Sequence, residues 1–115
     1  MSTTLAVIGG GNMARSIISG AISGGVLKLE DIVVADPDPF SQEYFKTLSI
    51  SVVASASLLP KSSQVLLAVK PQIFDSISTD VSADVVVSIM AGVSTEKISG
   101  SIARGKVVRV MPNLP

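Results

Sequence analysis

Six short apolar runs, rich in Val, Ile, Leu and Ala, constrain the fold of this chain more than any other feature. They occupy residues 5–8, 32–35, 50–54, 65–69, 85–90 and 107–111. Each run has the length of a β-strand, and most are continuously apolar rather than alternating. Continuously apolar strands are typical of parallel sheets that are covered by helices on both faces. The pattern therefore predicts a buried parallel sheet of six strands.

Helical segments are predicted between most of these runs. Apolar residues recur at helical spacing over residues 13–22, and a second helix is expected directly after residues 36–39. A third helix is predicted to begin near Pro71, and a fourth after Ser94, whose hydroxyl can cap it. Only a short piece, residues 55–59, lies between the third and fourth runs. This alternation predicts right-handed βαβ units in a Rossmann-like, doubly wound α/β fold with a mainly parallel six-stranded sheet and helices on both faces.

The length and the charge balance restrict the classes of function. The chain has 115 residues, which is enough for one domain, residues 1–115. Nine Lys and Arg balance nine Asp and Glu without a basic cluster, so a nucleic-acid partner is not expected. The apolar runs reach about six residues, far below the roughly 20 that cross a bilayer. We therefore expect a cytoplasmic protein that binds a small molecule and neither nucleic acid nor membrane.

The sequence contains no cysteine and no histidine. Their absence removes thiolate nucleophiles, disulfides, the commonest general base and the commonest metal ligands. No metal site is expected, and no catalytic residue can be assigned. Any chemistry has to come from a bound cofactor or from outside this segment.

A glycine-rich turn follows the first apolar run. Residues 9–14, Gly-Gly-Gly-Asn-Met-Ala, match the pattern G-x-G-x-x-A. In dinucleotide-binding proteins the first glycine permits a tight turn, the second lets a pyrophosphate approach the backbone, and the small third residue lets the helix pack on the strand. Free N–H groups at the start of the helix then face the phosphates. Glycine also serves ordinary turns, but the place of this motif between the first strand and the first helix favours dinucleotide binding.

An acidic residue, Asp36, ends the second run. It lies about 20 residues beyond the glycine turn, where a carboxylate meets the adenosine ribose hydroxyls in such proteins. The alternative is a turn former, because Asp-Pro pairs initiate turns, and the two roles are compatible. A carboxylate here repels a 2′-phosphate, and no arginine lies between Asp36 and Lys46 to offset that repulsion. NADH is therefore expected to be favoured over NADPH.

Polar or irregular positions also follow the later runs, at 70–72, 91–92 and 112–113. Ligands of open parallel sheets bind at the carboxyl ends of the strands. We therefore expect the first strand to be central and one edge of the sheet to hold Gly9, Asp36, Lys70, Gly92 and Asn113. The alternatives are a solvated lysine, an ordinary turn glycine and an asparagine that caps a following helix.

Four motifs run in register along the chain. They are Ile-Gly-Gly-Gly-Asn-Met-Ala at 8–14, Ala-Val-Lys-Pro-Gln at 68–72, Ser-Ile-Met-Ala-Gly-Val-Ser at 88–94 and Val-Arg-Val-Met-Pro-Asn-Leu-Pro at 108–115. Together they resemble the N-terminal domain of the pyrroline-5-carboxylate reductases. The resemblance implies transfer of a hydride from NAD(P)H, in this family often NADPH, to the C=N carbon of 1-pyrroline-5-carboxylate, which gives L-proline.

The resemblance also assigns cofactor-binding positions. It puts the pyrophosphate at Gly9, Gly10, Gly11, Asn12 and Met13, the adenosine ribose at Asp36, and the second ribose and nicotinamide along Ala68, Val69, Lys70, Pro71, Ala91 and Gly92, with Asn113 near the substrate. Two positions depart from the family: Leu114 replaces the usual Thr, and residues 62–64 lack the usual acid. The resemblance also implies a C-terminal helical domain, which forms the homo-oligomer and most of the substrate pocket, and we expect that domain to lie outside this chain. The fragment alone is therefore expected to be inactive.

Two other hypotheses stay open. The chain could be the cofactor domain of a related reductase, of the β-hydroxyacid or coenzyme F420-dependent type. It could also be a non-catalytic nucleotide-binding or sensor module. Substrate tests on the full-length enzyme separate the first from the leading hypothesis, and a reading frame that continues past Pro115 into a helical domain excludes the second.

Overall fold

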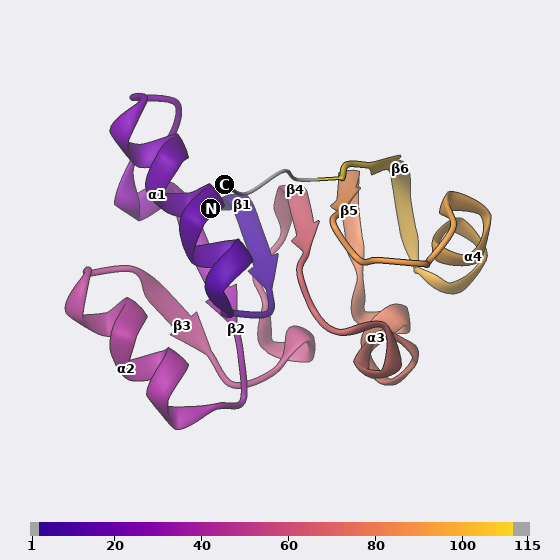
Figure 1. Cartoon of the computed structure of the whole chain (residues 1–115), viewed down its shortest axis with the longest axis horizontal. Coiled ribbons are helices and arrows are strands. Elements are labelled where there is room, and N and C mark those ends of the chain that lie inside the picture. The colour runs from indigo at the N-terminus through magenta and orange to yellow at the C-terminus, as the bar shows by residue number, and fades with distance from the viewer. Residues whose placement is uncertain (1–2, 112–115) are drawn as a thin grey trace.

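The computed structural model describes residues 3–111 of the chain. Its strands are β1 (Thr3–Ile8), β2 (Ile32–Ala35), β3 (Ser51–Val53), β4 (Ser62–Leu67), β5 (Ser82–Ser88) and β6 (Arg104–Arg109). They form one sheet in the order β3-β2-β1-β4-β5-β6, and every neighbouring pair is parallel (Figure 1). This is the strand order of a doubly wound dinucleotide-binding fold. The predicted fold class is confirmed, with β1 and β4 at the centre of the sheet.

Of the four helices in the described residues, α2 and α4 begin at a side-chain cap. They are α1 (Asn12–Ser23), α2 (Pro39–Thr47), α3 (Pro71–Ile77) and α4 (Thr95–Ser101), with 3-10 turns η1 (Leu29–Asp31), η2 (Ala56–Leu58) and η3 (Ser78–Asp80). The Asp38 carboxylate accepts from the Phe40 N–H at the start of α2, and the Ser94 hydroxyl accepts from the Lys97 N–H at the start of α4. The starts of α1 and α3 are different, because neither Gly11 nor Lys70 makes a side-chain cap hydrogen bond.

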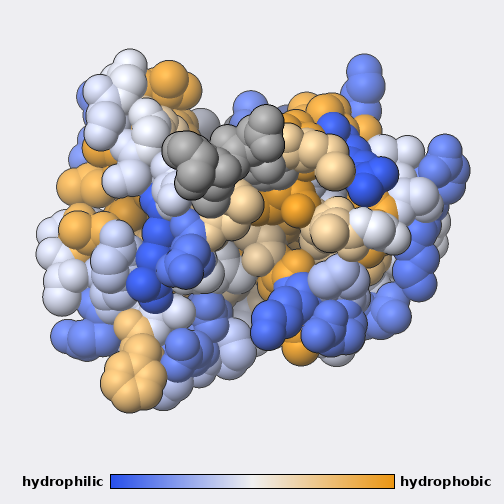
Figure 2. Space-filling view, viewed as in Figure 1, coloured by the Kyte–Doolittle hydropathy of each residue, from blue (hydrophilic) through white to orange (hydrophobic). Residues whose placement is uncertain are grey.

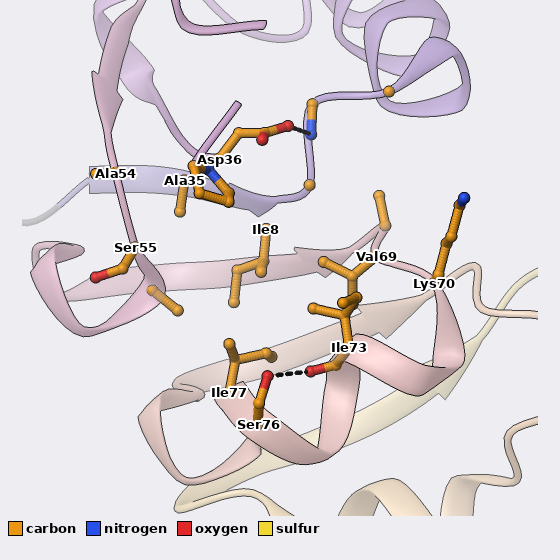
Figure 3. A pocket seen from close by; sticks show the side chains of 16 residues that line it. Ile8, Ala35, Asp36, Ala54, Ser55, Val69, Lys70, Ile73, Ser76 and Ile77 are labelled. Carbon is orange, nitrogen blue, oxygen red and sulfur yellow. Dashed lines mark hydrogen bonds between the residues drawn. The ribbon is translucent and has the colours of Figure 1, made fainter. Parts of the chain in front are cut away.

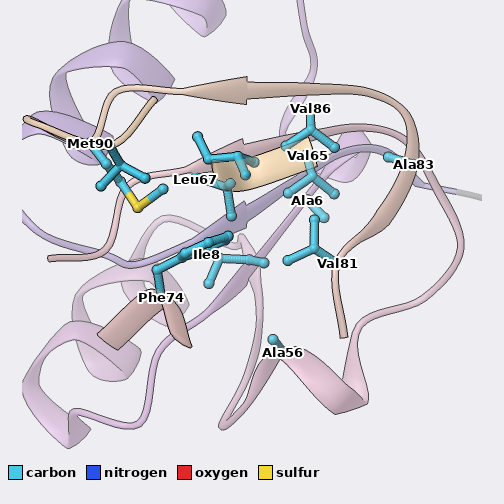
Figure 4. Packing of buried hydrophobic residues seen from close by; sticks show 12 residues of the cluster. Ala6, Ile8, Ala56, Val65, Leu67, Phe74, Val81, Ala83, Val86 and Met90 are labelled. Atoms are coloured by element: carbon cyan, nitrogen blue, oxygen red, sulfur yellow. The ribbon is translucent and has the colours of Figure 1, made fainter. Parts of the chain in front are cut away.

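Two apolar cores lie on opposite faces of the sheet. Successive side chains of β1 point to opposite faces. Leu5 and Val7 join the core beneath α1 and α2, while Ala6 and Ile8 join the core beneath α3 and α4 (Figure 4). Both faces of β1 are therefore buried over residues 5–8, which explains why this run is continuously apolar rather than alternating. None of the helices within residues 3–111 has the length and hydropathy needed to cross a membrane.

The structure corrects the predicted bounds of several elements. β4 starts at Ser62 and ends at Leu67, whereas the apolar run predicted residues 65–69. The polar start of β4 belongs to the strand because its backbone pairs with β1 and β5 whatever its side chains are. β5 and β6 are shifted toward the N-terminus in the same way. The connection from β3 to β4 holds only η2, so the alternation of strand and helix is interrupted there.

Candidate functional site

A cavity of about 560 Å³ opens at the carboxyl ends of β1, β2, β3 and β4. Parallel strands end at the same edge of a sheet, so segments that are distant in sequence meet there. The cavity is lined by residues 8–11 at the end of β1, 35–37 at the end of β2, 54–56 after β3, 68–70 after β4, and by Ile73, Ser76 and Ile77 of α3 (Figure 3). Figure 2 shows apolar residues near the middle of this face of the molecule, with hydrophilic residues to the left of them and below.

The structure brings most of the predicted site residues together. The cavity wall includes Gly9, Gly10, Gly11, Asp36, Ala68, Val69 and Lys70. Asn12 and Met13 begin α1, and Pro71 begins α3, so these three lie directly beside the wall. Ala91 and Gly92 form an exposed turn after β5, at the same edge of the sheet but outside the cavity lining. Asn113 lies outside the described residues.

Gly9 has to be glycine for two separate reasons. Its φ is +102°, a conformation that L side chains rarely adopt. A Cβ built on it would lie 2.6 Å from the carbonyl oxygen of Ala68, at the end of the neighbouring strand. The Gly9 N–H donates to the carbonyl of Ala35 at 2.9 Å. The turn is therefore packed directly against the ends of β2 and β4.

The Asp36 carboxylate ties the glycine turn to the end of β2. Its Oδ2 accepts from the Gly10 N–H at 2.7 Å, and its Oδ1 accepts from the Asp38 N–H at 2.8 Å. The second bond shows that Asp36 shapes the turn that follows β2. Each carboxylate oxygen has a further lone pair, so the group can still accept from a ligand hydroxyl. The ribose and turn-forming roles are thus compatible in this geometry.

The N-terminus of α1 carries unoccupied backbone donors beside the cavity. Within residues 3–111, no hydrogen bond occupies the N–H groups of Gly11, Asn12 or Met13. No side chain caps the helix, and no acidic residue lies in its first turn. A Cβ on Gly11 would meet no atom within 4 Å, so the space above the turn is open. Free N–H groups and the helix dipole together favour an anion at this point.

An apolar slot continues from the N-terminus of α1. It is lined by Ile73 and Ile77 of α3 and by Ala54 and Ala56 beyond β3, and Ile8 also lines it, from the end of β1 (Figure 3). Ile73 is 47% exposed, so part of this apolar wall is accessible from solvent. Such walls suit a flat ring of low polarity. Because Ala54 and Ala56 follow a strand, the edge rule could have found them. The two isoleucines carry no comparable signal in the sequence.

The charged groups around the cavity are few. Lys70 is exposed and lies at the N-cap of α3, on the side opposite Asp36 (Figure 3). No group of three His, Cys, Asp or Glu within the described part of the chain could hold a metal ion. Arg15, which the sequence analysis did not single out, lies behind the turn and donates from Nε to the Gly10 carbonyl at 3.0 Å. The arrangement suits binding of an anion with an attached ring, not proton transfer by a histidine or cysteine.

Comparison with known proteins places this geometry in a family. Residues 4–92 match the family described as NADP oxidoreductase coenzyme F420-dependent. The chain belongs to this family. It is 40% identical to the pyrroline-5-carboxylate reductase of Haemophilus influenzae, over 96% of this chain and 43% of that protein. The curated relatives it matches are more than twice as long, since the chain covers 43 to 45% of the first three.

Solved structures of family relatives have the same fold. A pyrroline-5-carboxylate reductase from Coxiella burnetii superposes with a TM-score of 0.82 at 27% identity, over 100% of this chain and 46% of that one. The pyrroline carboxylate reductase of Plasmodium falciparum, described with NADP bound, superposes with a TM-score of 0.77 at 23% identity, over 96% of this chain and 42% of that one. The family's fold therefore extends over the described part of this chain, residues 3–111.

Proposed function

We propose that this chain is the dinucleotide-binding domain, residues 1–115, of a pyrroline-5-carboxylate reductase and that its cavity binds NAD(P)H. The observation that carries the proposal is the glycine turn. Its open face and free N–H groups lie at one end of an apolar slot, at the carboxyl edge of a doubly wound sheet. The names of the relatives, pyrroline-5-carboxylate reductases, support the same activity.

The residues around the cavity fit the parts of a dinucleotide. The N–H groups of residues 11–13 would hold the pyrophosphate, and the free lone pairs of Asp36 would accept from the adenosine ribose. The slot between η2 and α3 would take the adenine ring. Residues 68–71 and 91–92 would line the second ribose and the nicotinamide, with Asn113 near the substrate. In this assignment the Lys70 ammonium adds a cation on the side of the cavity opposite Asp36.

The chemistry of the reaction lies with the cofactor. When bound, reduced nicotinamide supplies a hydride to the C=N carbon of 1-pyrroline-5-carboxylate, and a proton on the nitrogen completes L-proline. This chain's contribution is to bind the dinucleotide, fix its orientation and exclude water from one side of the reacting carbon. A further helical domain, which also forms the homo-oligomer, completes the substrate pocket in this proposal. The domain alone is therefore expected to bind cofactor without turnover.

Asp36 also supports a preference for NADH. Its carboxylate is held by two N–H donors, so it cannot swing away from the ribose position without losing both bonds. A 2′-phosphate placed there would face a fixed negative charge. The family's description and the Plasmodium falciparum structure both name NADP, which favours NADPH instead. The measured preference between NADH and NADPH is therefore a direct test of the role of Asp36.

Equilibrium titration tests the binding proposal. The purified chain is titrated with NADH and with NADPH while nicotinamide fluorescence is followed, and ADP-ribose is used as a competitor. We expect saturable binding of both, tighter for NADH, and competitive displacement by ADP-ribose. A folded chain that binds neither dinucleotide at millimolar concentration would falsify the proposal.

The activity itself is tested on the full-length enzyme. It is assayed with 1-pyrroline-5-carboxylate and, as a control, with coenzyme F420 and a β-hydroxyacid, because the family's description also names F420. We expect oxidation of NAD(P)H only with the pyrroline. Turnover with F420 or the hydroxyacid instead would identify a related reductase, and the absence of any turnover would favour a non-catalytic nucleotide-binding module.

A further inference from the structure

Arg15 lies on α1 behind the glycine turn, outside the cavity lining. Its Nε donates to the Gly10 carbonyl at 3.0 Å, and its Nη2 donates to the Ser41 hydroxyl of α2 at 3.3 Å. The guanidinium also stacks on Tyr44, with Cζ 4.1 Å from the ring centroid. No carboxylate among residues 3–111 forms an ion pair with it. Arg15 is thus held in place by hydrogen bonds and by a ring.

Gly10 is consequently fixed from both sides. Its N–H donates to Asp36 at 2.7 Å, and its carbonyl accepts from Arg15. In a planar trans peptide the carbonyl of one residue and the N–H of the next point in opposite directions. Holding the Gly10 carbonyl toward Arg15 therefore turns the Gly11 N–H away from Arg15. Gly11 lies in the cavity wall and its N–H has no partner within the described residues.

We propose that Arg15 is a positioning residue that orients the Gly10–Gly11 peptide, so that the Gly11 N–H faces the pyrophosphate before the cofactor arrives. This inference rests on the proposed dinucleotide binding. Glycine adopts positive and negative φ with similar ease, so a peptide between two glycines has little intrinsic reason to hold one orientation. If the peptide populates the competent orientation for only part of the time, the apparent affinity falls by that fraction. Arg15 raises the fraction by binding the carbonyl.

A purely structural role for Arg15 makes a different prediction. Through Ser41 and Tyr44 the guanidinium also joins α1 to α2, and this joint does not involve the glycine turn. If the joint were its only contribution, Ser41→Ala and the Arg15 variants would lower stability together and change affinity together. If Arg15 orients the peptide, affinity depends on a donor at the Nε position alone.

Two variants of equal side-chain length isolate that donor. Arg15→Gln places an N–H donor the same number of bonds from the backbone as Nε, whereas Arg15→Met places a methyl group there. Ser41→Ala removes the hydrogen bond from Arg15 to α2, and it leaves the stacking on Tyr44 and the bond to Gly10. Arg104→Met is the matched control, since Arg104 is an exposed arginine at the start of β6, paired with Asp84 at the opposite edge of the sheet.

The experiment measures the affinity of each variant for NADH and for ADP-ribose, which has the pyrophosphate but no nicotinamide. Amide hydrogen exchange at Gly10 is followed by NMR without ligand, and thermal melts verify the fold. For Arg15→Met we expect about tenfold weaker binding of both probes and faster exchange at Gly10. For Arg15→Gln, Ser41→Ala and Arg104→Met we expect affinities within about threefold of the original chain.

Several results overturn the inference. Unchanged affinity in Arg15→Met does so, and so does an equal loss in Arg15→Gln and Arg15→Met, because the donor at Nε would then be irrelevant. If Arg15→Met does not fold, Arg15→Gln decides alone. Faster exchange of the Gly10 amide in folded Arg15→Gln contradicts the positioning role. Unchanged exchange of that amide together with unchanged affinity supports it. If the original chain binds no dinucleotide, the proposed function fails, and the exchange at Gly10 in the Arg15 variants still decides whether Arg15 holds the turn.

Discussion

Two alanine substitutions in the glycine turn, two residues apart, should affect different properties. Gly9→Ala should lower the stability of the fold, and Gly11→Ala should lower the affinity for the dinucleotide. At Gly9 the φ of +102° and the carbonyl of Ala68, 2.6 Å from the position of a Cβ, both exclude a side chain. At Gly11 the φ is −77°, which any residue adopts, and a Cβ would have no neighbour within 4 Å. Gly9→Ala is therefore a test of folding, and Gly11→Ala is a test of ligand binding.

The magnitudes follow from these geometries. For Gly9→Ala, the left-handed conformation costs about 1–2 kcal/mol in a residue with a Cβ, and forcing an atom against a strand backbone costs about 1–3 kcal/mol more. A loss of about 3 kcal/mol lowers the melting temperature by roughly 10 °C in a domain of this size. For Gly11→Ala, a weaker helix cap is offset by reduced entropy of the unfolded chain, so stability changes by less than about 1 kcal/mol. Its methyl group enters the space of the pyrophosphate, and affinity should fall about tenfold or more, or about 1.4 kcal/mol.

The assay combines unfolding in guanidinium chloride with titration of NADH by fluorescence, on the same preparations. Gly20→Ala on the exposed face of α1 is the control, because no atom lies within 4 Å of its Cβ position and it is remote from the turn. We expect Gly9→Ala to lower the unfolding midpoint and Gly11→Ala to lower only the affinity. A stable Gly9→Ala, or a Gly11→Ala that binds NADH as tightly as the original chain, would refute the assigned roles of the two glycines.

Three further predictions test the rest of the proposal. Asp36→Ser should raise the affinity for NADPH relative to NADH about tenfold, because it removes the charge facing the 2′-phosphate, and titration that finds no relative gain contradicts the ribose role. The same variant leaves the N–H groups of Gly10 and Asp38 without their acceptor, so its free energy of unfolding should fall by about 1–3 kcal/mol in chemical denaturation. An unchanged unfolding midpoint would mean that the two bonds do not stabilise the fold. The purified 115-residue chain should bind dinucleotide yet reduce no 1-pyrroline-5-carboxylate in a coupled absorbance assay, because the imine carbon is not held near the hydride donor. Turnover near that of the full-length enzyme would place the whole substrate site within this domain.

The sequence determined the fold class and the edge of the sheet at which the site lies. The apolar run of β1, the glycines after it and the helical spacing of α1 are all local patterns, and each strongly restricts the conformation of its own segment. Once strands alternate with crossovers, right-handed connections bring all carboxyl ends to one edge. For this reason the sequence predicts that Gly9, Asp36 and Lys70 share one edge of the sheet, and all three line the cavity there.

Tertiary structure decided which groups actually meet at that edge. The bond between Gly10 and Asp36 joins residues 26 positions apart, and it depends on how closely β2 packs beside β1. The contact of Arg15 with Gly10 depends on the rotation of α1 and on its packing against α2 through Tyr44. Such contacts require distances correct to a fraction of an ångström, and no local pattern records them. The residues that form the turn are therefore written in the sequence, whereas the groups that hold it in one orientation are selected only when the helices pack on the sheet.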